Sequence, residues 1–312
     1  MVYAVISDVH GNLPALEAVL ADARRMGAGQ FLLVGDYITD LCWSRQVYEV
    51  LRDLDNAHLV AGNREGYMRQ VDLSQRGREQ VASVILTWEQ LGKDGCAWAL
   101  ALPHSLTLST PDGNQRLYLE HCLPGRHHVQ RSVGLASHTL DERYPNRPAK
   151  KEEVRAMLRD CIQRDPAWTE TARSAGARVF LHGHNHLQYS LELDGVLYVN
   201  PGSCGMPLDH RPGAPYTLLR YEDGVFSVEE RRVAYDLERT VEEYRNSPYY
   251  QAAPGWCQML IWQLQTARDH NRVLFQMLQE EQERCSPQTD SQHNQVFRRA
   301  VERTKEWYYP SR

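Results

Sequence analysis

Short apolar runs alternate with amphipathic stretches in the first part of the chain. The run at 2–7 is rich in β-branched residues and predicts a strand, and Asn12, followed by apolar residues at helical spacing, predicts a capped helix. Two further strands are expected at 31–34 and 58–61, with a helix at 47–54 between them. Strands that alternate with helices in this way are typical of α/β proteins.

The pattern changes beyond residue 66. Helical periodicity fills most of 66–100, and strands are predicted at 105–108 and 116–120. The polar segment 125–151 predicts a long surface loop, and a helix is expected at 151–165. Strands then return at 177–181, 188–193, 196–199, 216–221 and 225–231, with hairpin turns at Asp194-Gly195 and Asp223-Gly224. We interpret these strands as a second, largely antiparallel group.

From about residue 235 onward the pattern is helical alone, with breaks at 246–248 and 285–287, where Ser precedes Pro. The segment 256–283 between the breaks carries apolar residues at helical spacing. We therefore expect one domain at 1–234 and a helical C-terminal extension at 235–312. This extension is either a helical hairpin packed on the domain or a surface for a homodimer or another partner.

Composition and charge narrow the classes of function. The chain has 312 residues, of which 42% are hydrophobic and 24% charged, enough for one large domain with an appendage. With a net charge of -5, the chain has no excess of positive charge that would attract a polyanion, so nucleic acid is not an expected partner. No apolar run is long enough to span a membrane, and the N-terminus lacks a signal-peptide pattern. Seven scattered cysteines without a Cys-x-x-Cys pair indicate reduced thiols, and the predicted location is cytoplasmic.

Side chains that can bind metal ions stand directly after several predicted strands. They comprise two carboxylates, one carboxamide and four imidazoles: Asp8, His10, Asp36, Asn63, His121, His184 and His186. Side chains two apart in an extended chain point the same way, so His184 and His186 are expected to converge on one point. A mixed oxygen and nitrogen set of this size exceeds the needs of one ion. It suits two divalent ions such as manganese, iron, zinc or cobalt, with a carboxylate between them.

The order of these residues resembles the calcineurin-like metallophosphoesterase superfamily. The matching motifs are Asp8-x-His10, Gly35-Asp36, Gly62-Asn63-x-Glu65, His121 and Gly183-His184-x-His186, and Leu102-Pro103 and Asn200-Pro-Gly-Ser203 further resemble its compact bacterial and archaeal phosphodiesterase branch. The resemblance runs from residue 1 to about 232. It implies an α/β (α+β) fold, a four-layer α/β/β/α sandwich of two mixed sheets flanked by helices, with residues 1–234 as the catalytic domain.

The resemblance also implies a metal-dependent phosphoesterase with two divalent ions. Carried over position by position, it assigns Asp8, His10 and His186 to one ion, Asn63, His121 and His184 to the other, and Asp36 to a bridge between them. Two such ions about 3.5 to 4 Å apart bind phosphoryl oxygens and lower the pKa of a shared water, so a bridging hydroxide is the implied nucleophile. A side-chain nucleophile is then unnecessary, in keeping with the lack of a serine or cysteine triad motif.

Two positions depart from the family pattern. Arg64 stands where the family commonly has histidine, and Cys122 stands after His121 where glycine is usual. Arginine stays protonated, so it is a poor proton donor but a good clamp for phosphate oxygens. We therefore expect a phosphodiesterase in which Asp36, Asn63 and Arg64 are catalytic. The alternative is that Arg64 only pairs with Glu65 or another carboxylate.

Other functions and roles stay open at this point. Hydrolysis of dinucleoside polyphosphates and of phosphoproteins would use the same metal chemistry, and a non-catalytic metal-binding interaction scaffold is the alternative from another class. The expected substrate is a small phosphoester, with nucleotides among the candidates. His182 is expected to pack beside the strand rather than to bind metal. Basic residues of the 125–151 segment either line the substrate mouth or form a solvated loop: Arg126, His127, His128, Arg131, His138, Arg143 and Arg147.

Overall fold

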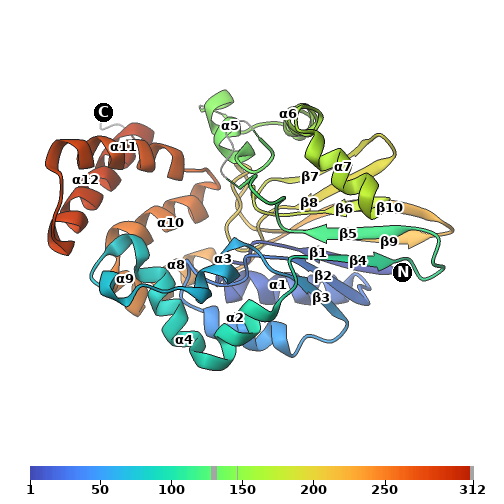
Figure 1. Ribbon diagram of the computed structural model, residues 1–312, viewed down its shortest axis with the longest axis horizontal. Helices are drawn as coiled ribbons and strands as arrows, with labels where there is room; N and C mark the ends of the chain where they lie inside the picture. Colours follow the sequence, from blue (N-terminus) through green and yellow to red (C-terminus); the bar gives the residue numbers. More distant parts are fainter. Residues whose placement is uncertain (128–131, 146, 310–312) are drawn as a thin grey trace.

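Two five-stranded mixed sheets lie face to face in the computed structural model, which describes residues 1–127, 132–145 and 147–309 (Figure 1). The first sheet has the order β10-β9-β1-β2-β3, formed by β1 (Val2–Ile6), β2 (Gln30–Val34), β3 (Ala57–Val60), β9 (Ala214–Glu222) and β10 (Val225–Val233). The second has the order β4-β5-β6-β8-β7, formed by β4 (Ser105–Ser109), β5 (Arg116–Glu120), β6 (Val179–Leu181), β7 (Gln188–Leu193) and β8 (Val196–Pro201). Apolar side chains from both inner faces, among them Val5, Leu32 and Leu181, form the core between the sheets.

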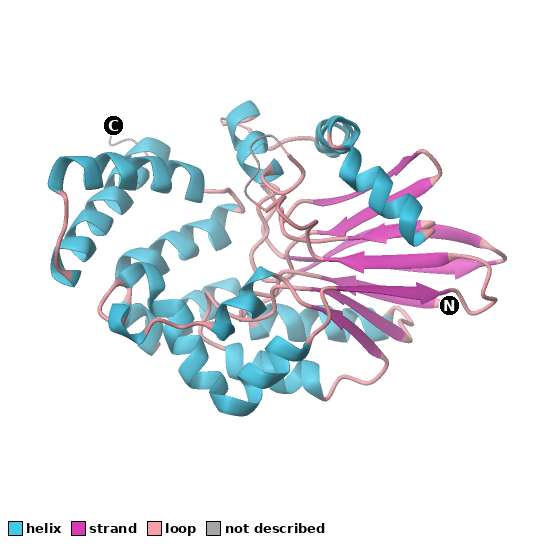
Figure 2. Ribbon diagram, in the orientation of Figure 1, coloured by secondary structure: helices cyan, strands magenta, loops and turns pink. Residues whose placement is uncertain are grey.

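Helices cover the outer faces of both sheets and complete a four-layer sandwich (Figure 2). The helices α1 (Leu13–Arg25), α2 (Ser44–Arg52) and α4 (Glu79–Ala101) pack on the first sheet, and α5 (Ala136–Arg143), α6 (Lys151–Arg164) and α7 (Pro166–Ala175) pack on the second. The Asn12 side chain accepts a hydrogen bond from the Ala15 backbone and caps α1 as predicted. The predicted α/β sandwich of two mixed sheets is therefore confirmed.

Strands 177–231 were expected to form a second, largely antiparallel group. The antiparallel pairs β7–β8 and β9–β10 occur, but the grouping was wrong. β6 and β8 pair in parallel with each other and β6 with β5, whereas β9 crosses to the first sheet and pairs antiparallel with β1. The two hairpins have their turns where expected, and Asp194, Gly195, Asp223 and Gly224 all have positive φ angles. A hairpin turn, however, fixes only the pairing of its two flanking strands and does not determine which sheet the pair joins.

The polar segment 125–151 is not a loop throughout, because it contains α5. Several buried residues of this helix are polar. The Ser137 side chain donates a hydrogen bond to the C-terminal extension, and the Asp141 side chain accepts one from it. A helix that buries hydrogen-bonded polar residues lacks the apolar stripe on which the sequence prediction depends. α7 was also missed, although Asp165 caps its first turn and Pro166 follows directly.

The chain after β10 is helical, as predicted, and lies beyond the edge of the sheets where the loops gather (Figure 1). It consists of α8 (Leu237–Arg245), α9 (Pro248–Ala252), α10 (Pro254–Thr266), α11 (Asn271–Cys285) and α12 (Asp290–Tyr308). Both predicted breaks occur, but 256–283 is two helices, since the chain turns at Ala267 with φ 50°. Apolar residues of α8–α10 pack on Leu41, Ala82 and Met206. None of the described helices is both long and apolar enough to cross a membrane.

Candidate metal centre

The seven candidate ligands follow the carboxyl ends of five strands. Asp8 and His10 follow β1, Asp36 follows β2 and Asn63 follows β3; His121 follows β5, and His184 and His186 follow β6. Since β1, β2 and β3 are parallel, as are β5 and β6, these ends meet at one edge of the two sheets. Sequence reasoning therefore placed the residues at the correct edge.

Left-handed backbone conformations aim five of these side chains. The φ angles are 54° at Asp8, 50° at His10, 56° at Asp36, 72° at His184 and 58° at His186. Non-glycine residues adopt this region at a cost, and such strained residues cluster at functional sites. The segment that holds His184 and His186 is consequently not extended. The expectation that strand alternation makes these two imidazoles converge on one point was wrong, because they join two different groups.

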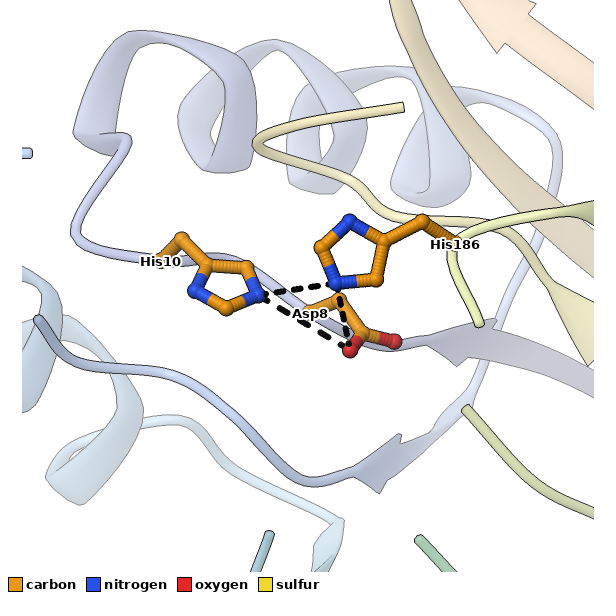
Figure 3. A group of neighbouring side chains, drawn as sticks. All are labelled: Asp8, His10 and His186. Atoms are coloured by element: carbon orange, nitrogen blue, oxygen red, sulfur yellow. Dashed lines mark hydrogen bonds and ion pairs between the residues drawn. The ribbon is translucent and has the colours of Figure 1, made fainter. Parts of the chain in front are cut away.

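The first group comprises Asp8, His10 and His186, whose side chains point toward one another (Figure 3). The two Nε2 atoms of His10 and His186 are 3.1 Å apart, and His186 Nε2 lies 3.3 Å from Asp8 Oδ1. Asp8 and His10 are almost completely buried, with 0% and 1% of their surface exposed. A buried carboxylate and two imidazoles at these distances form one candidate site for a divalent ion.

The second group comprises Asp36, His121 and His184, and Asn63 lies beside it. His121 Nε2 is 3.4 Å from Asp36 Oδ2, and His184 Nδ1 is 2.9 Å from Asn63 Oδ1. The same Oδ2 atom of Asp36 is 3.9 Å from His10 Nε2 in the first group. Asp8 Oδ1 in turn lies 4.0 Å from His121 Nε2, so both carboxylates, Asp36 and Asp8, come close to each group.

One nitrogen of each imidazole donates a hydrogen bond to an acceptor outside the groups. The acceptors are Asp40 for His10 Nδ1, the Val34 carbonyl for His121 Nδ1, the Met206 carbonyl for His186 Nδ1 and the His127 carbonyl for His184 Nε2. These bonds fix the tautomers, so the other nitrogen of each neutral ring presents a lone pair to the centre. His121 Nε2 has no hydrogen-bond partner at all among the described residues.

The hydrogen-bond acceptors of the two groups are arranged in a way that suits the binding of cations. A carboxamide oxygen facing an imidazole lone pair at 2.9 Å, and two imidazole lone pairs facing each other at 3.1 Å, repel unless a proton or cation lies between them. Burial lowers the pKa of His186, but Asp8 raises it above its ordinary value, so without metal a proton can lie between His10 and His186. Burial lowers the pKa of His184 to about 3, so no proton offsets its contact with Asn63. Burial also lowers the pKa of His121, but Asp36 and Asp8 raise it to about 10. Burial raises the pKa of Asp8, yet His186 and His121 bring it to about 2. The centre therefore concentrates negative charge and lone pairs in a buried space.

Comparison with known proteins agrees with this geometry. A family model described as the calcineurin-like phosphoesterase superfamily domain matches residues 1–224. The chain belongs to this superfamily. Members generally bind divalent metal ions, and the family is one of phosphoesterases.

Relatives from bacteria and archaea share the fold. A metallophosphoesterase from Sphaerobacter thermophilus is 22% identical with a TM-score of 0.58, and the match covers 86% of this chain and 100% of that one. A hypothetical protein from Pyrococcus horikoshii is 17% identical with a TM-score of 0.56, covering 84% and 97%. An uncharacterised protein of Methanocaldococcus jannaschii is 23% identical over 255 residues, 77% of this chain and 90% of the relative. These likenesses support the fold of the family.

Sequence reasoning missed Asp40, which is hydrogen-bonded to His10 of the first group. Its Oδ2 accepts the hydrogen bond of His10 Nδ1 at 2.8 Å, and Asp40 is 1% exposed. It follows Asp36 by four residues in a turn where Thr39 and Asp40 both have positive φ angles. Neither periodicity nor a motif marks such a turn, so the sequence carried no signal for it.

Glu65 and Asn200, which the motifs contained without an assigned role, hold the loops together. Glu65 is fully buried and accepts hydrogen bonds from the backbone amides of Asp36, Tyr37 and Gly62 at 2.7 to 3.0 Å. Asn200 donates to the Gly183 carbonyl at 2.9 Å, just before His184. These side chains therefore fix the backbone that carries the candidate ligands.

Arg64 pairs with a carboxylate and also faces the cavity beside the centre. Its Nη2 lies 3.1 Å from Asp40 Oδ2, its Nε lies 3.9 Å from Asp36 Oδ2, and its guanidinium stands 5.5 Å from the Tyr67 ring centroid. Glu65, the other pairing partner considered, instead binds backbone amides. About a quarter of the Arg64 side chain is exposed, and Nε has no hydrogen-bond partner among the described residues.

Residues of the 125–151 segment differ in their position. His127 and His138 line the cavity beside the centre. Arg126 instead pairs with Asp165, and Arg147 with Glu153. His128 and Arg131 lie outside the described residues, and Arg143 does not line that cavity. His182 is fully buried against Trp168 and Tyr189, which agrees with a packing role.

Proposed function

We propose that this chain is a dinuclear metal-dependent phosphoesterase that acts on phosphodiesters. The observation that carries this proposal is the convergence of two buried carboxylates and four imidazoles, each imidazole with its second nitrogen already bonded elsewhere. The proposed ligands are Asp8, His10 and His186 for one ion and Asn63, His121 and His184 for the other, with Asp36 shared. Manganese, iron, zinc and cobalt all suit this donor set.

Two divalent ions bound there would place positive charge on the phosphoryl oxygens and supply a water of lowered pKa. The residues of the chain have separate tasks. Asp8 and Asp36 offset the charge of the ions, and Asn63 contributes a neutral oxygen. Arg64 lines the cavity with about a quarter of its side chain exposed, so its guanidinium would hold a phosphate oxygen while Asp40 restrains it.

The proposed preference for diesters rests on Arg64. A guanidinium does not lose its proton at working pH, so it stabilises charge without protonating a leaving group. A diester with a good leaving group needs proton donation less than a monoester with a poor one. Arg64→His would provide a group that titrates near neutrality at the same place.

The test is the hydrolysis of bis(p-nitrophenyl) phosphate beside p-nitrophenyl phosphate with manganese. We expect turnover of the diester by the wild type, its loss in Asp36→Asn, and a shift toward the monoester in Arg64→His. Asp53→Asn and Arg52→His make the same exchanges in an exposed ion pair and should leave both rates unchanged. A wild type that prefers the monoester would overturn the diester proposal.

The metal content and the hydrolysis rates together separate this proposal from the non-catalytic alternative. We expect close to two manganese ions per chain after dialysis, and fewer in Asp36→Asn, by elemental analysis. Metal without hydrolysis of either chromogenic ester directs the search to dinucleoside polyphosphates and phosphoproteins. Protein that holds no metal and hydrolyses nothing would contradict the proposal and favour an interaction scaffold.

A further inference from the structure

The C-terminal extension forms one wall of the cavity beside the metal centre. This cavity has a volume of about 330 Å³ and is lined by His10, Asp36, Arg64 and other residues of the centre, and by Trp256, Gln263, Asn271 and Phe275 of the extension. A second cavity of about 700 Å³ adjoins it and shares Arg64, Asn271, Trp256 and Phe275 with it. The extension therefore contributes to the surroundings of the proposed reaction site.

A buried polar joint fixes the extension in this position. Asp141 on α5 accepts hydrogen bonds from His210 Nε2 at 2.8 Å, from Arg268 Nη1 at 3.0 Å and from the Asp269 backbone amide at 2.6 Å. Ser137, one turn earlier on α5, donates to Asp269 at 2.7 Å. Because Arg268 and Asp269 lie between α10 and α11, this joint holds both helices against the catalytic part of the chain.

Aromatic side chains give the larger cavity flat apolar faces. Tyr67, Trp256, Phe275 and Phe297 line it, and Phe275 and Tyr67 are 53% and 39% exposed. Exposed large aromatic rings beside a cavity suit a planar ligand, because stacking buries both faces without restricting many torsions. Tyr67 also stands next to the Arg64 guanidinium.

Carboxamides supply most of the polar lining of the larger cavity. Besides Asn63 they are Gln70, Gln75, Gln80, Asn271 and Gln282, while Arg64 is the single arginine or lysine in the described lining. A lipid chain would leave these amides without partners, and a second phosphate would need more cations. A neutral planar ring with donors and acceptors along its edge matches both the aromatic and the amide groups.

Gln263 adds an independent observation on the side of the metal centre. It is fully buried and lines the smaller cavity, and neither its Oε1 nor its Nε2 has a hydrogen-bond partner among the described residues. Trp256 Nε1 and Asn271 Oδ1 are unpartnered in the same way. A buried amide without partners costs about 1 to 3 kcal/mol, and a ligand with a donor and an acceptor would satisfy it.

We infer that the two cavities form a substrate subsite built by the C-terminal extension, which binds a nucleoside attached to the reacting phosphate. The inference rests on the proposed function in that the phosphate lies at the metal centre. The extension then acts as a specificity element, with aromatic rings stacking on the base and carboxamides reading its edge. The predicted homodimer through these helices is a separate hypothesis.

The test compares the binding of adenosine 5′-monophosphate and ribose 5-phosphate to the full-length, manganese-loaded protein by calorimetry. The two ligands differ at C1′, where the nucleotide carries adenine and ribose 5-phosphate carries a hydroxyl group. We expect the nucleotide to bind roughly tenfold or more tightly, because stacking of a base on an aromatic ring has an effect of this size. Phe275→Ala should reduce this ratio severalfold and leave ribose 5-phosphate unaffected. Trp307→Ala removes another exposed aromatic residue of the extension that lines neither cavity, and should leave the ratio unchanged.

Gln263→Met separates a ligand-binding role from a structural one. Loss of an unsatisfied buried amide should leave the melting temperature of the ligand-free protein unchanged or raise it, while the preference for the nucleotide falls. Equal binding of the two ligands by the wild type, no binding of either, or a ratio that survives in Phe275→Ala would overturn the inference. A base preference without any hydrolysis would preserve the subsite and contradict the phosphoesterase, so the two failures are distinguishable.

Discussion

Arg64 Nη2 lies 3.1 Å from Asp40 Oδ2, and the same carboxylate oxygen accepts a hydrogen bond from His10 Nδ1 at 2.8 Å. Burial raises the pKa of Asp40, but Arg64 and His10 more than offset this and lower it, so the carboxylate is charged. One buried side chain thus orients a proposed metal ligand and the proposed phosphate clamp together.

Asp40→Asn is expected to weaken manganese binding about 10- to 100-fold, the usual cost of losing such a supporting carboxylate. The amide keeps an acceptor but loses the charge that stabilises both partners. Competition with a chelating dye measures the affinity, and Asp53→Asn, a carboxylate in an exposed pair with Arg52, is the matched control. Unchanged affinity in Asp40→Asn would show that His10 needs no charged partner.

Glu65→Gln should destabilise the fold by about 1 to 3 kcal/mol. Three backbone amides converge on the two carboxylate oxygens of Glu65, and a carboxamide would turn its NH2 group toward at least one of them. Urea denaturation of the metal-free protein measures the free energy of unfolding. Glu17→Gln, at an exposed position of α1, should change it by less than about 0.5 kcal/mol, and an equal effect of the two exchanges would contradict the role of Glu65.

The sequence predicted the sheet edge of the site because the signals there are local. An apolar β-branched run such as Val2–Ile6 identifies a strand, and the polar residue that ends it must lie at the edge of the sheet. The family resemblance then supplied the pairing of ligands between β1 and β6, which no local pattern contains. The confirmed fold class has the same origin.

Contacts between distant segments were not accessible in this way. Asp40 contacts His10 because a turn of residues with left-handed backbone conformation brings it there. The sequence pattern does not reveal α5, because Asp141 is buried with hydrogen bonds rather than with apolar contacts. That Phe275 lines the same cavity as Arg64 depends on the turn at Ala267, inside a segment that the apolar pattern represents as one helix. Such features follow from tertiary packing and not from periodicity.

Gly205→Ala is expected to disturb the first ligand group selectively. A Cβ atom at Gly205 would lie 1.8 Å from the Val9 carbonyl oxygen, so the segment that carries Asp8 and His10 would have to move. Overpacking of this kind costs about 1 to 3 kcal/mol, and we expect the manganese content to fall together with the melting temperature. Gly29→Ala, where an added Cβ meets nothing within 4 Å, should change neither. Full metal content in Gly205→Ala would show that the loop accommodates the side chain.

The stability of the extension should depend on pH through His270. This residue is fully buried; burial lowers its pKa and outweighs the opposing effects of Asp141 and Asp269, while Arg268 lowers it further. The unfolded chain therefore takes up a proton near pH 6.5 before the folded chain does, so His270 makes stability fall as the pH drops below that value. The substitution His270→Asn removes this contribution to the pH dependence of stability. Urea denaturation measures the free energy of unfolding of both proteins between pH 7.5 and 5.5. As the pH falls, the wild type should lose stability relative to the variant by at most about 1.4 kcal/mol per pH unit. A difference that stays constant with pH would mean that His270 is protonated in the folded protein as readily as in the unfolded one.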